Sequence, residues 1–209
     1  MGLEPMKIVI LDPTERKRLI KRRRETGADR FDEVWDGVYV MSPIGDNLHQ
    51  YLSGKLVSAL DQSFGATESI KVFPAVNISD REEKWKRNFR CPDVAIFSAR
   101  NPAKDRGNHW LGGPDFAVEI LSPHDRSRRK LQFYAKVGVR ELLLIDRDPW
   151  CLEPYRLRGA ALEPAGKTDL AVPSTLSSTV LPLTFRLLPS EPRPLIELAR
   201  ADTGQHWTV

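Results

Sequence analysis

A six-residue apolar run with one charged residue inside it constrains the fold of this chain more than any other segment. The run is FAVEIL, residues 116–121, and its apolar side chains are typical of a buried strand. Glu119 lies inside this run. Because an ionised carboxylate is rarely buried unless a cation pairs with it, the sequence predicts one of two arrangements. Either Glu119 meets a cation, or the strand exposes one face.

Strand and helix patterns on both sides of this run predict an α/β core. An Asp36–Gly37 pair between alternating apolar residues predicts a hairpin at 31–43, and leucines at helical spacing predict a helix at 45–64. Further strands are predicted at 70–78, 89–97, 141–146 and 151–157, and a further helix is predicted at 126–139. A hairpin, a helix and then strands with a helix between two of them favour an α/β core built on one sheet.

The chain has 209 residues, which suits one domain or one domain with an appendage. We expect a basic N-terminal helical segment over residues 1–29, a core domain over 30–158, and residues 159–209 as a C-terminal strand and loosely ordered tail of the same domain. The first segment contains a predicted helix at 11–29, with Asp12 or Thr14 as its cap. The tail has one strand candidate, STVLPLTFRLLP.

A second carboxylate interrupts another apolar run, because Asp93 follows Pro92 in CPDVAIF. In neighbouring strands, about 4.8 Å apart, the carboxylates of Asp93 and Glu119 would repel each other unless one is protonated or a cation lies between them. Mg²⁺ is a simple solution, since one or two carboxylates and water can hold it. Lys130, near the start of the next helix, could fold back and help to stabilise negative charge. These groups together have the chemistry of phosphodiester hydrolysis, in which a metal ion activates water.

Longer segments that contain these residues resemble one known family. They are CPDVAIF (91–97), PDFAVEILSP (114–123) and KLQFYAKVGVRELLLIDRDPW with the nearby LEPYRL (130–157). In this order they resemble the Uma-type restriction endonuclease family of the PD-(D/E)XK nuclease superfamily, and FDEVWDGVYVMSP (31–43) resembles the early acidic segment of that family. The resemblance runs from about Arg30 to about Leu157. It implies a restriction-endonuclease-like α/β fold for the core domain, with a mixed central sheet flanked by helices.

The resemblance also implies a metal site. Asp93 and Glu119 match the two acidic positions of the family motif and would bind the metal ion. Glu33 matches the early acidic residue and would complete the metal site from the opposite side. The implied ion is Mg²⁺, with Mn²⁺ as a possible substitute.

The catalytic lysine departs from the superfamily motif. The motif has a lysine two positions after the second acidic residue, where this chain has Leu121. The resemblance implies that Lys130, on the next helix, takes this role. Arg128 or Arg129 could reach the site instead.

Clustered basic residues are candidates for contact with nucleic acid, because Lys and Arg neutralise backbone phosphates. The candidates are Arg16, Lys17, Lys21 and Arg22 in the predicted N-terminal helix, and Arg126, Arg128 and Arg129 in the predicted helix at 126–139. Such contacts carry little sequence information. The alternative is an ordinary solvated helix face, and the net charge of +4 permits a polyanionic partner without demanding one.

The hypothesis that follows is a Mg²⁺-dependent endonuclease that acts on DNA, with a homodimer supplying the two sites that a double-strand cut needs. The alternative is a nuclease-fold protein that has no catalytic activity and binds nucleic acid or a protein partner, since fold does not secure function. A third hypothesis is a structural protein whose strand acids form ion pairs. Cleavage separates the first two hypotheses, and metal binding separates the first from the third.

The cellular location of the protein is predicted from features that the sequence lacks. No apolar run approaches the roughly 18 residues of a membrane span. The 2 cysteines fit no zinc spacing and no disulfide framework, and no targeting segment is recognised. We therefore expect a cytoplasmic protein without a membrane partner.

Overall fold

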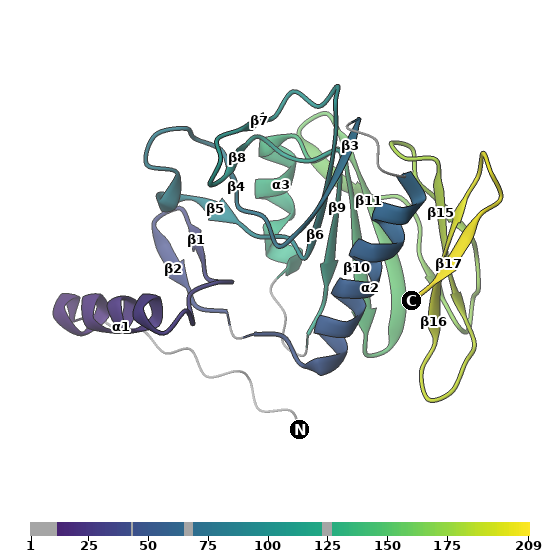
Figure 1. The fold of residues 1–209 in the computed structure, drawn as a ribbon, viewed down its shortest axis with the longest axis horizontal. Coiled ribbons are helices and arrows are strands. Elements are labelled where there is room, and N and C mark those ends of the chain that lie inside the picture. Colours follow the sequence, from purple (N-terminus) through teal and green to yellow (C-terminus); the bar gives the residue numbers. More distant parts are fainter. Residues whose placement is uncertain (1–11, 43, 65–68, 123–126) are drawn as a thin grey trace.

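The computed structural model describes residues 12–42, 44–64, 69–122 and 127–209, whose strands form three sheets. Figure 1 shows a central sheet with α2 and α3, a smaller sheet near α1, and a third sheet near the C-terminus. The predicted mixed α/β fold is confirmed.

A mixed sheet of seven strands forms the centre of the molecule. Its strands are β3 (Ile70–Pro74), β6 (Val94–Ser98), β9 (Phe116–Ile120), β10 (Glu141–Arg147), β11 (Trp150–Arg158), β12 (Ala161–Pro164) and β13 (Thr168–Asp169). Their order is β12-β11-β10-β9-β6-β3, and β13 also pairs with β11. Strands β9 and β10 are parallel, while the other pairs are antiparallel.

The helices of the described residues are α1 (Pro13–Glu25), α2 (Asn47–Phe64), the short 3-10 helices η1 (Trp85–Arg87) and η2 (Ser127–Lys130), and α3 (Leu131–Val137). Of these, α2 and α3 pack against the central sheet, whereas α1 lies near the smaller sheet (Figure 1). Asp12 is the cap of α1, because its side chain accepts two backbone hydrogen bonds of the first turn. The predicted leucine stripe of α2 is buried, with Leu52, Leu56 and Leu60 in the core. Within the described part of the chain, no helix is both long enough and apolar enough to cross a membrane.

Strand β9 has both faces covered, which decides between the two arrangements predicted for Glu119. Val118 packs in the same core as α2, whereas Ala117 packs in the core that contains α3 residues. Because successive strand residues point to opposite faces, Glu119 points to the α3 side. Its exposed fraction is 3%, so the strand does not expose this face to solvent.

A second sheet begins with the predicted hairpin at Asp36–Gly37. Its strands are β1 (Glu33–Trp35), β2 (Val38–Val40), β4 (Ile78–Ser79), β5 (Phe89–Arg90), β7 (Lys104–Asp105) and β8 (Trp110–Leu111), in the order β2-β1-β5-β4-β8-β7. Asp36 and Gly37 have φ values of 48° and 87°, the left-handed pair of a tight two-residue hairpin turn. The predicted hairpin is therefore confirmed.

Two predicted strands are each divided between the central and the second sheet. The run 70–78 becomes β3 and β4, and the run 89–97 becomes β5 and β6. Pro74 ends β3, and Ala75 follows it with a φ of 46°. Pro92 lies between β5 and β6, where a residue without a backbone donor interrupts the ladder. These breaks place Asp93 in a connection at the start of β6 instead of inside a continuous strand.

The C-terminal segment differs from its prediction. Instead of one strand and a loose end, it forms a sheet of β14 (Leu176–Ser177), β15 (Leu183–Leu188), β16 (Leu195–Arg200) and β17 (His206–Thr208). The prediction of a loose end was wrong because short alternating runs were hidden among prolines and serines. Leu183, Phe185 and Leu187 alternate with exposed or half-buried residues and join the core of α2, and Val209 is also buried. The division at residues 29 and 158 stays a prediction.

Glu141 joins this third sheet to the central sheet. Its side chain is buried, with an exposed fraction of 1%, at the start of β10. It accepts hydrogen bonds from Ser178 Oγ at 2.7 Å and from the backbone N–H of Thr179 at 2.9 Å. Arg156 Nε lies 3.5 Å from its other oxygen. The loop before β15 is therefore held by one buried carboxylate.

Replacing Glu141 with Ala should lower the free energy of unfolding by about 2–3 kcal/mol, because the hydrogen bonds from Ser178 and Thr179 to this buried carboxylate are lost. Chemical denaturation measures this loss. Glu163→Ala is the control, since Glu163 is 53% exposed beside Arg158 and should change stability by less than about 1 kcal/mol. Equal losses in the two variants would contradict the proposed link between the sheets.

Candidate active site

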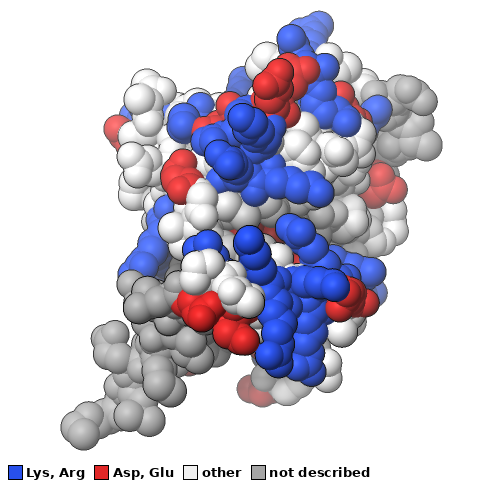
Figure 2. Space-filling model, turned by 90° about the vertical axis from the view of Figure 1, so that its left-hand side faces the viewer, with Lys and Arg blue, Asp and Glu red and all other residues white. Residues whose placement is uncertain are grey.

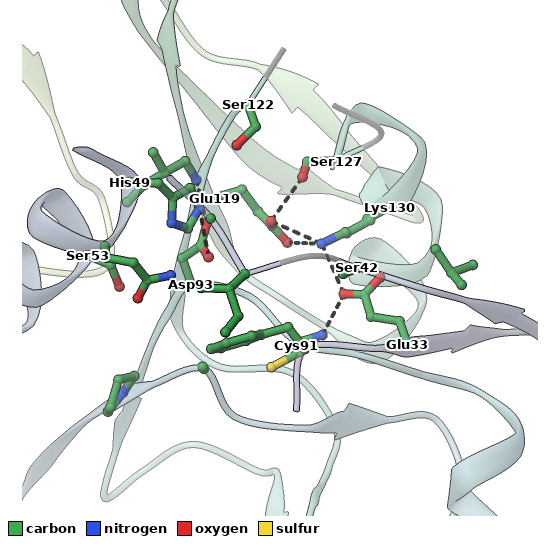
Figure 3. Close-up of a pocket in the computed structure, with 18 of the residues that line it drawn as sticks. Glu33, Ser42, His49, Ser53, Cys91, Asp93, Glu119, Ser122, Ser127 and Lys130 are labelled. Atoms are coloured by element: carbon green, nitrogen blue, oxygen red, sulfur yellow. Dashed lines mark hydrogen bonds and ion pairs between the residues drawn. The ribbon is translucent and has the colours of Figure 1, made fainter. Parts of the chain in front are cut away.

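Acidic residues and a lysine from separate elements line one cavity of about 560 Å³. Glu33 comes from β1, Asp93 from the connection before β6, Glu119 from β9, and Lys130 from the end of η2. Figure 3 shows these side chains gathered round the cavity. The structure therefore brings together the residues that were predicted to be catalytic or to bind metal.

Glu119 is paired with the cation that its burial predicts. Lys130 Nζ donates to both carboxylate oxygens, at 2.9 and 3.0 Å. Ser127 Oγ donates to the same carboxylate at 3.0 Å, and the Tyr134 hydroxyl also donates to it. Burial raises the pKa of Glu119 to about 7, and the charge of Lys130 opposes this rise while nearby carboxylates add to it. The cation beside Glu119 is thus a side chain of the same chain.

Lys130 lies between two carboxylates. Its Nζ is 3.0 Å from Glu33 Oε1 as well as close to Glu119. Burial alone would lower the pKa of Lys130, but the charges of Glu119 and Glu33 outweigh it and raise the pKa above its usual value. The side chain is therefore a charged ammonium on the cavity wall. An ammonium has donors but no acceptor, so it can orient or stabilise an anion but cannot take up a proton.

Glu33 holds two parts of the site in place. Its Oε2 accepts a hydrogen bond from the Trp35 indole at 2.6 Å. Its Oε1 accepts one from the backbone N–H of Cys91 at 2.8 Å, and Lys130 lies near the same atom. Cys91 stands two residues before Asp93, so its hydrogen bond to Glu33 also fixes the backbone just before Asp93. That Glu33 binds metal stays a prediction, whereas its contacts favour a role in holding Lys130.

Asp93 is held beside Glu119 by the backbone of β9 and by a histidine. Its Oδ2 accepts a hydrogen bond from the backbone N–H of Ile120 at 2.7 Å. Its Oδ1 is 3.3 Å from His49 Nε2, which comes from α2. Burial opposes protonation of His49, but Asp93 outweighs this and raises the pKa of the imidazole. Among the described residues, His49 Nδ1 has no hydrogen-bond partner.

The space for His49 depends on the absence of a side chain at Gly45. A Cβ built on Gly45 would lie 2.6 Å from two atoms of the imidazole ring. No side-chain carbon is tolerated at that distance without movement of the ring. Gly45 therefore allows the contact between His49 and Asp93.

The sequence interpretation missed His49, Ser127 and Tyr134 as parts of this site. Tyr134 stands four residues after Lys130, a spacing that puts two side chains on one face of a helix. That spacing could have identified Tyr134 as a second partner of Glu119. His49 directly follows Leu48, off the buried stripe of α2, but nothing in the sequence indicates that it meets Asp93.

The predicted phosphate-binding residues lie at different places. Arg16, Lys17, Lys21 and Arg22 are exposed on α1, Arg128 and Arg129 are exposed in η2, and Arg126 lies outside the described residues. Arg128 pairs with Glu153 and lies 3.7 Å from Asp146. Of the three basic side chains Arg128, Arg129 and Lys130, it is Lys130 that contacts Glu119.

The donors round the cavity are of the kind that a hard divalent cation prefers. Asp93 and Glu119 offer carboxylate oxygens at the same edge of the sheet, and Mg²⁺ needs one or two carboxylates with water in its other positions. In the described ranges, no group of three or more His, Cys, Asp and Glu residues is arranged to hold a metal. The residues therefore fit an ion bound by two carboxylates and water.

Comparisons with known proteins place the chain in a family. A family model named Uma2 and described as "Putative restriction endonuclease" matches residues 19–189, whereas no curated protein matches. A crystal structure described as "a putative nuclease belonging to DUF820", from Anabaena variabilis ATCC 29413, is similar with a TM-score of 0.54 and 22% identity. The match covers 66% of this chain and 76% of that chain, and it confirms the predicted restriction-endonuclease-like fold. Because the family model spans most of the sequence, this chain belongs to the Uma2 family.

Proposed function

We propose that this chain is a metal-dependent endonuclease that hydrolyses phosphodiester bonds in DNA. One observation supports the proposal most: Asp93, Glu119 and Lys130 come from three elements and line one cavity. Membership of a family described by nuclease activity supports the same reaction class. A homodimer, which would supply two sites for a double-strand cut, stays a prediction.

In this proposal, Asp93 and Glu119 hold Mg²⁺, with Mn²⁺ as a substitute. Such an ion would activate water and neutralise charge on the phosphate. Lys130 Nζ, on the cavity wall, supplies a positive charge that stabilises the negative charge developing on a phosphoryl oxygen. Glu33 and Glu119 keep Nζ in place and keep it charged.

His49 acts in this proposal as a positioning residue. It contacts the Asp93 oxygen that is not bound by the backbone of Ile120. The two contacts together fix both oxygens of the carboxylate. A ligand held in this way needs no reorganisation when an ion arrives.

A binding protein without catalysis is the second candidate function. The observation in its favour is that Glu119 already has Lys130, Ser127 and Tyr134 as partners. An acid that is satisfied within the protein gains less from a metal ion. Such a protein would bind nucleic acid through its basic residues and leave it intact.

Purified protein should nick supercoiled plasmid DNA with Mg²⁺ or Mn²⁺ and should be inactive with a chelator. Glu119→Gln keeps the shape of the buried side chain but removes its charge, and should reduce nicking by about 10²-fold or more. Gel electrophoresis of the plasmid measures the rate, and Glu163→Gln is an exposed control. Equal nicking by wild type and Glu119→Gln would refute the assignment. No nicking, with binding of DNA retained, would favour the second candidate function.

Lys130→Met should have opposite effects on catalysis and on metal binding. Loss of the ammonium should slow single-turnover cleavage by about 10²–10³-fold. The same change should tighten Mn²⁺ binding in calorimetry, because a positive charge beside the carboxylates has been removed. Lys130→Arg keeps the charge and should bind Mn²⁺ like the wild type. Wild-type cleavage by Lys130→Met would exclude a catalytic role for Lys130.

Gly45→Ala should lower cleavage about tenfold at low Mg²⁺, because the new methyl group displaces His49 and frees Asp93. A high Mg²⁺ concentration should restore part of the rate, which a folding defect would not allow. Gly54→Ala is the matched control, since nothing lies within 4 Å of its added Cβ. An unchanged Mg²⁺ requirement in Gly45→Ala would show that His49 does not position Asp93.

A further inference from the structure

A second cavity of about 890 Å³ lies next to the candidate site. It is bounded by α1, by the β1–β2 hairpin and by η1 with β5. We call it the basic groove, after the cations that line it: Arg16, Arg24, Arg30, Lys86 and Arg87. Figure 2 shows Lys and Arg gathered on this face of the molecule, in groups separated by a hollow.

The cations of the basic groove are not neutralised by the protein. Among the described residues, none of the five side chains forms an ion pair with a carboxylate. The groove also contains Asp29 and Asp32. Asp32 is already compensated, because Arg23 binds both of its oxygens at 2.6 Å and the Tyr39 hydroxyl donates to it. The groove therefore carries a net positive charge that an anion can balance.

The basic groove and the candidate site share a wall, the β1–β2 hairpin. Glu33 and Trp35 line the candidate site, whereas Asp32 and Val34 line the groove, as the alternation of a strand requires. Met41 lines both. A polymer that occupies the candidate site can therefore continue past the edge of the hairpin into the groove.

The aromatic residues of the groove support its cations and do not offer a stacking platform. The Trp85 ring stacks on His109 with centroids 4.7 Å apart, and Phe89 packs edge-on against it at 5.2 Å. Lys86 Nζ lies 5.6 Å from the centroid of the same ring. A ring engaged in this way is a rigid base for Lys86. Contacts to the phosphate backbone thus fit the groove better than contacts to unstacked bases.

We propose that the basic groove binds the backbone of duplex DNA that flanks the bond held in the candidate site. This inference rests on the proposed function, and it adds the substrate contacts that the candidate site lacks. The cations on the two sides of the groove then contact phosphates of the DNA backbone that lies between them. Arg24, Arg30, Lys86 and Arg87 thereby join Arg16 as substrate-binding residues.

Binding is measured apart from cleavage, by fluorescence anisotropy of a labelled DNA duplex with chelator present. The test variants are Lys86→Ala with Arg87→Ala, and Arg24→Ala with Arg30→Ala. Each pair should weaken binding and should reduce the slope of log affinity against log salt by about 0.9 for each phosphate contact that is lost. Arg158→Ala with Lys167→Ala removes the same charge from exposed positions on β11 and before β13, and should leave the slope unchanged.

The outcomes separate this inference from the proposed function. If the slope of log affinity against log salt falls in the groove variants but not in the control, DNA binding by the basic groove is supported, even if the wild type does not cleave DNA. Equal slopes in groove and control variants, or no binding by the wild type, would overturn it. The inference is also overturned if the groove variants change the salt slope for an RNA duplex of equal length but not for the DNA duplex. Thermal unfolding of every variant verifies that the fold is retained.

Discussion

The contact of Lys130 with Glu119 and Glu33 is the interaction on which the rest of the site depends. Three charged groups meet where the exposed fraction of each side chain is 12% or less. Buried charges of this kind are tolerated when they are paired and hydrogen-bonded. One ammonium satisfies acids from two different sheets, so β1, β9 and η2 have to converge. Removing the ammonium would leave two buried carboxylates without a cation, whereas removing either acid would leave the other acid paired with Lys130.

The short hairpin that contains Glu33 also organises the face beyond the cavity. Asp32 and Glu33 are consecutive, and each is neutralised by a cation from a different element, Arg23 of α1 and Lys130 of η2. Because their side chains point to opposite sides, one strand separates an acidic cavity from a basic groove. β1 has three residues. It can separate the two cavities only because Asp32 and Glu33 are each held by an ion pair.

The sequence predicted the parts of this structure that have short-range signals. The hairpin at Asp36–Gly37, the leucine stripe of α2 and the strand that contains Glu119 follow from turn chemistry and periodicity, whereas the choice between a buried, paired Glu119 and a strand with one exposed face needed the structure. The meeting of His49 with Asp93 does not follow from the sequence, because it depends on how α2 lies across the sheet. The C-terminal sheet was missed for a related reason. Its strands are short, and their burial is decided by a distant partner, the core of α2, and not by their own composition.

Lys130 also makes the folding of this chain independent of the binding of metal ions. In proteins whose ligands repel one another until a metal arrives, the free energy of metal binding is part of the free energy of folding, and chelators unfold them. Here a side chain of the same polypeptide relieves the repulsion between Glu33 and Glu119. The acidic cavity can therefore assemble whatever the ion content of the solution. A cation that binds later changes the charge of the cavity but is not needed for the cavity to form.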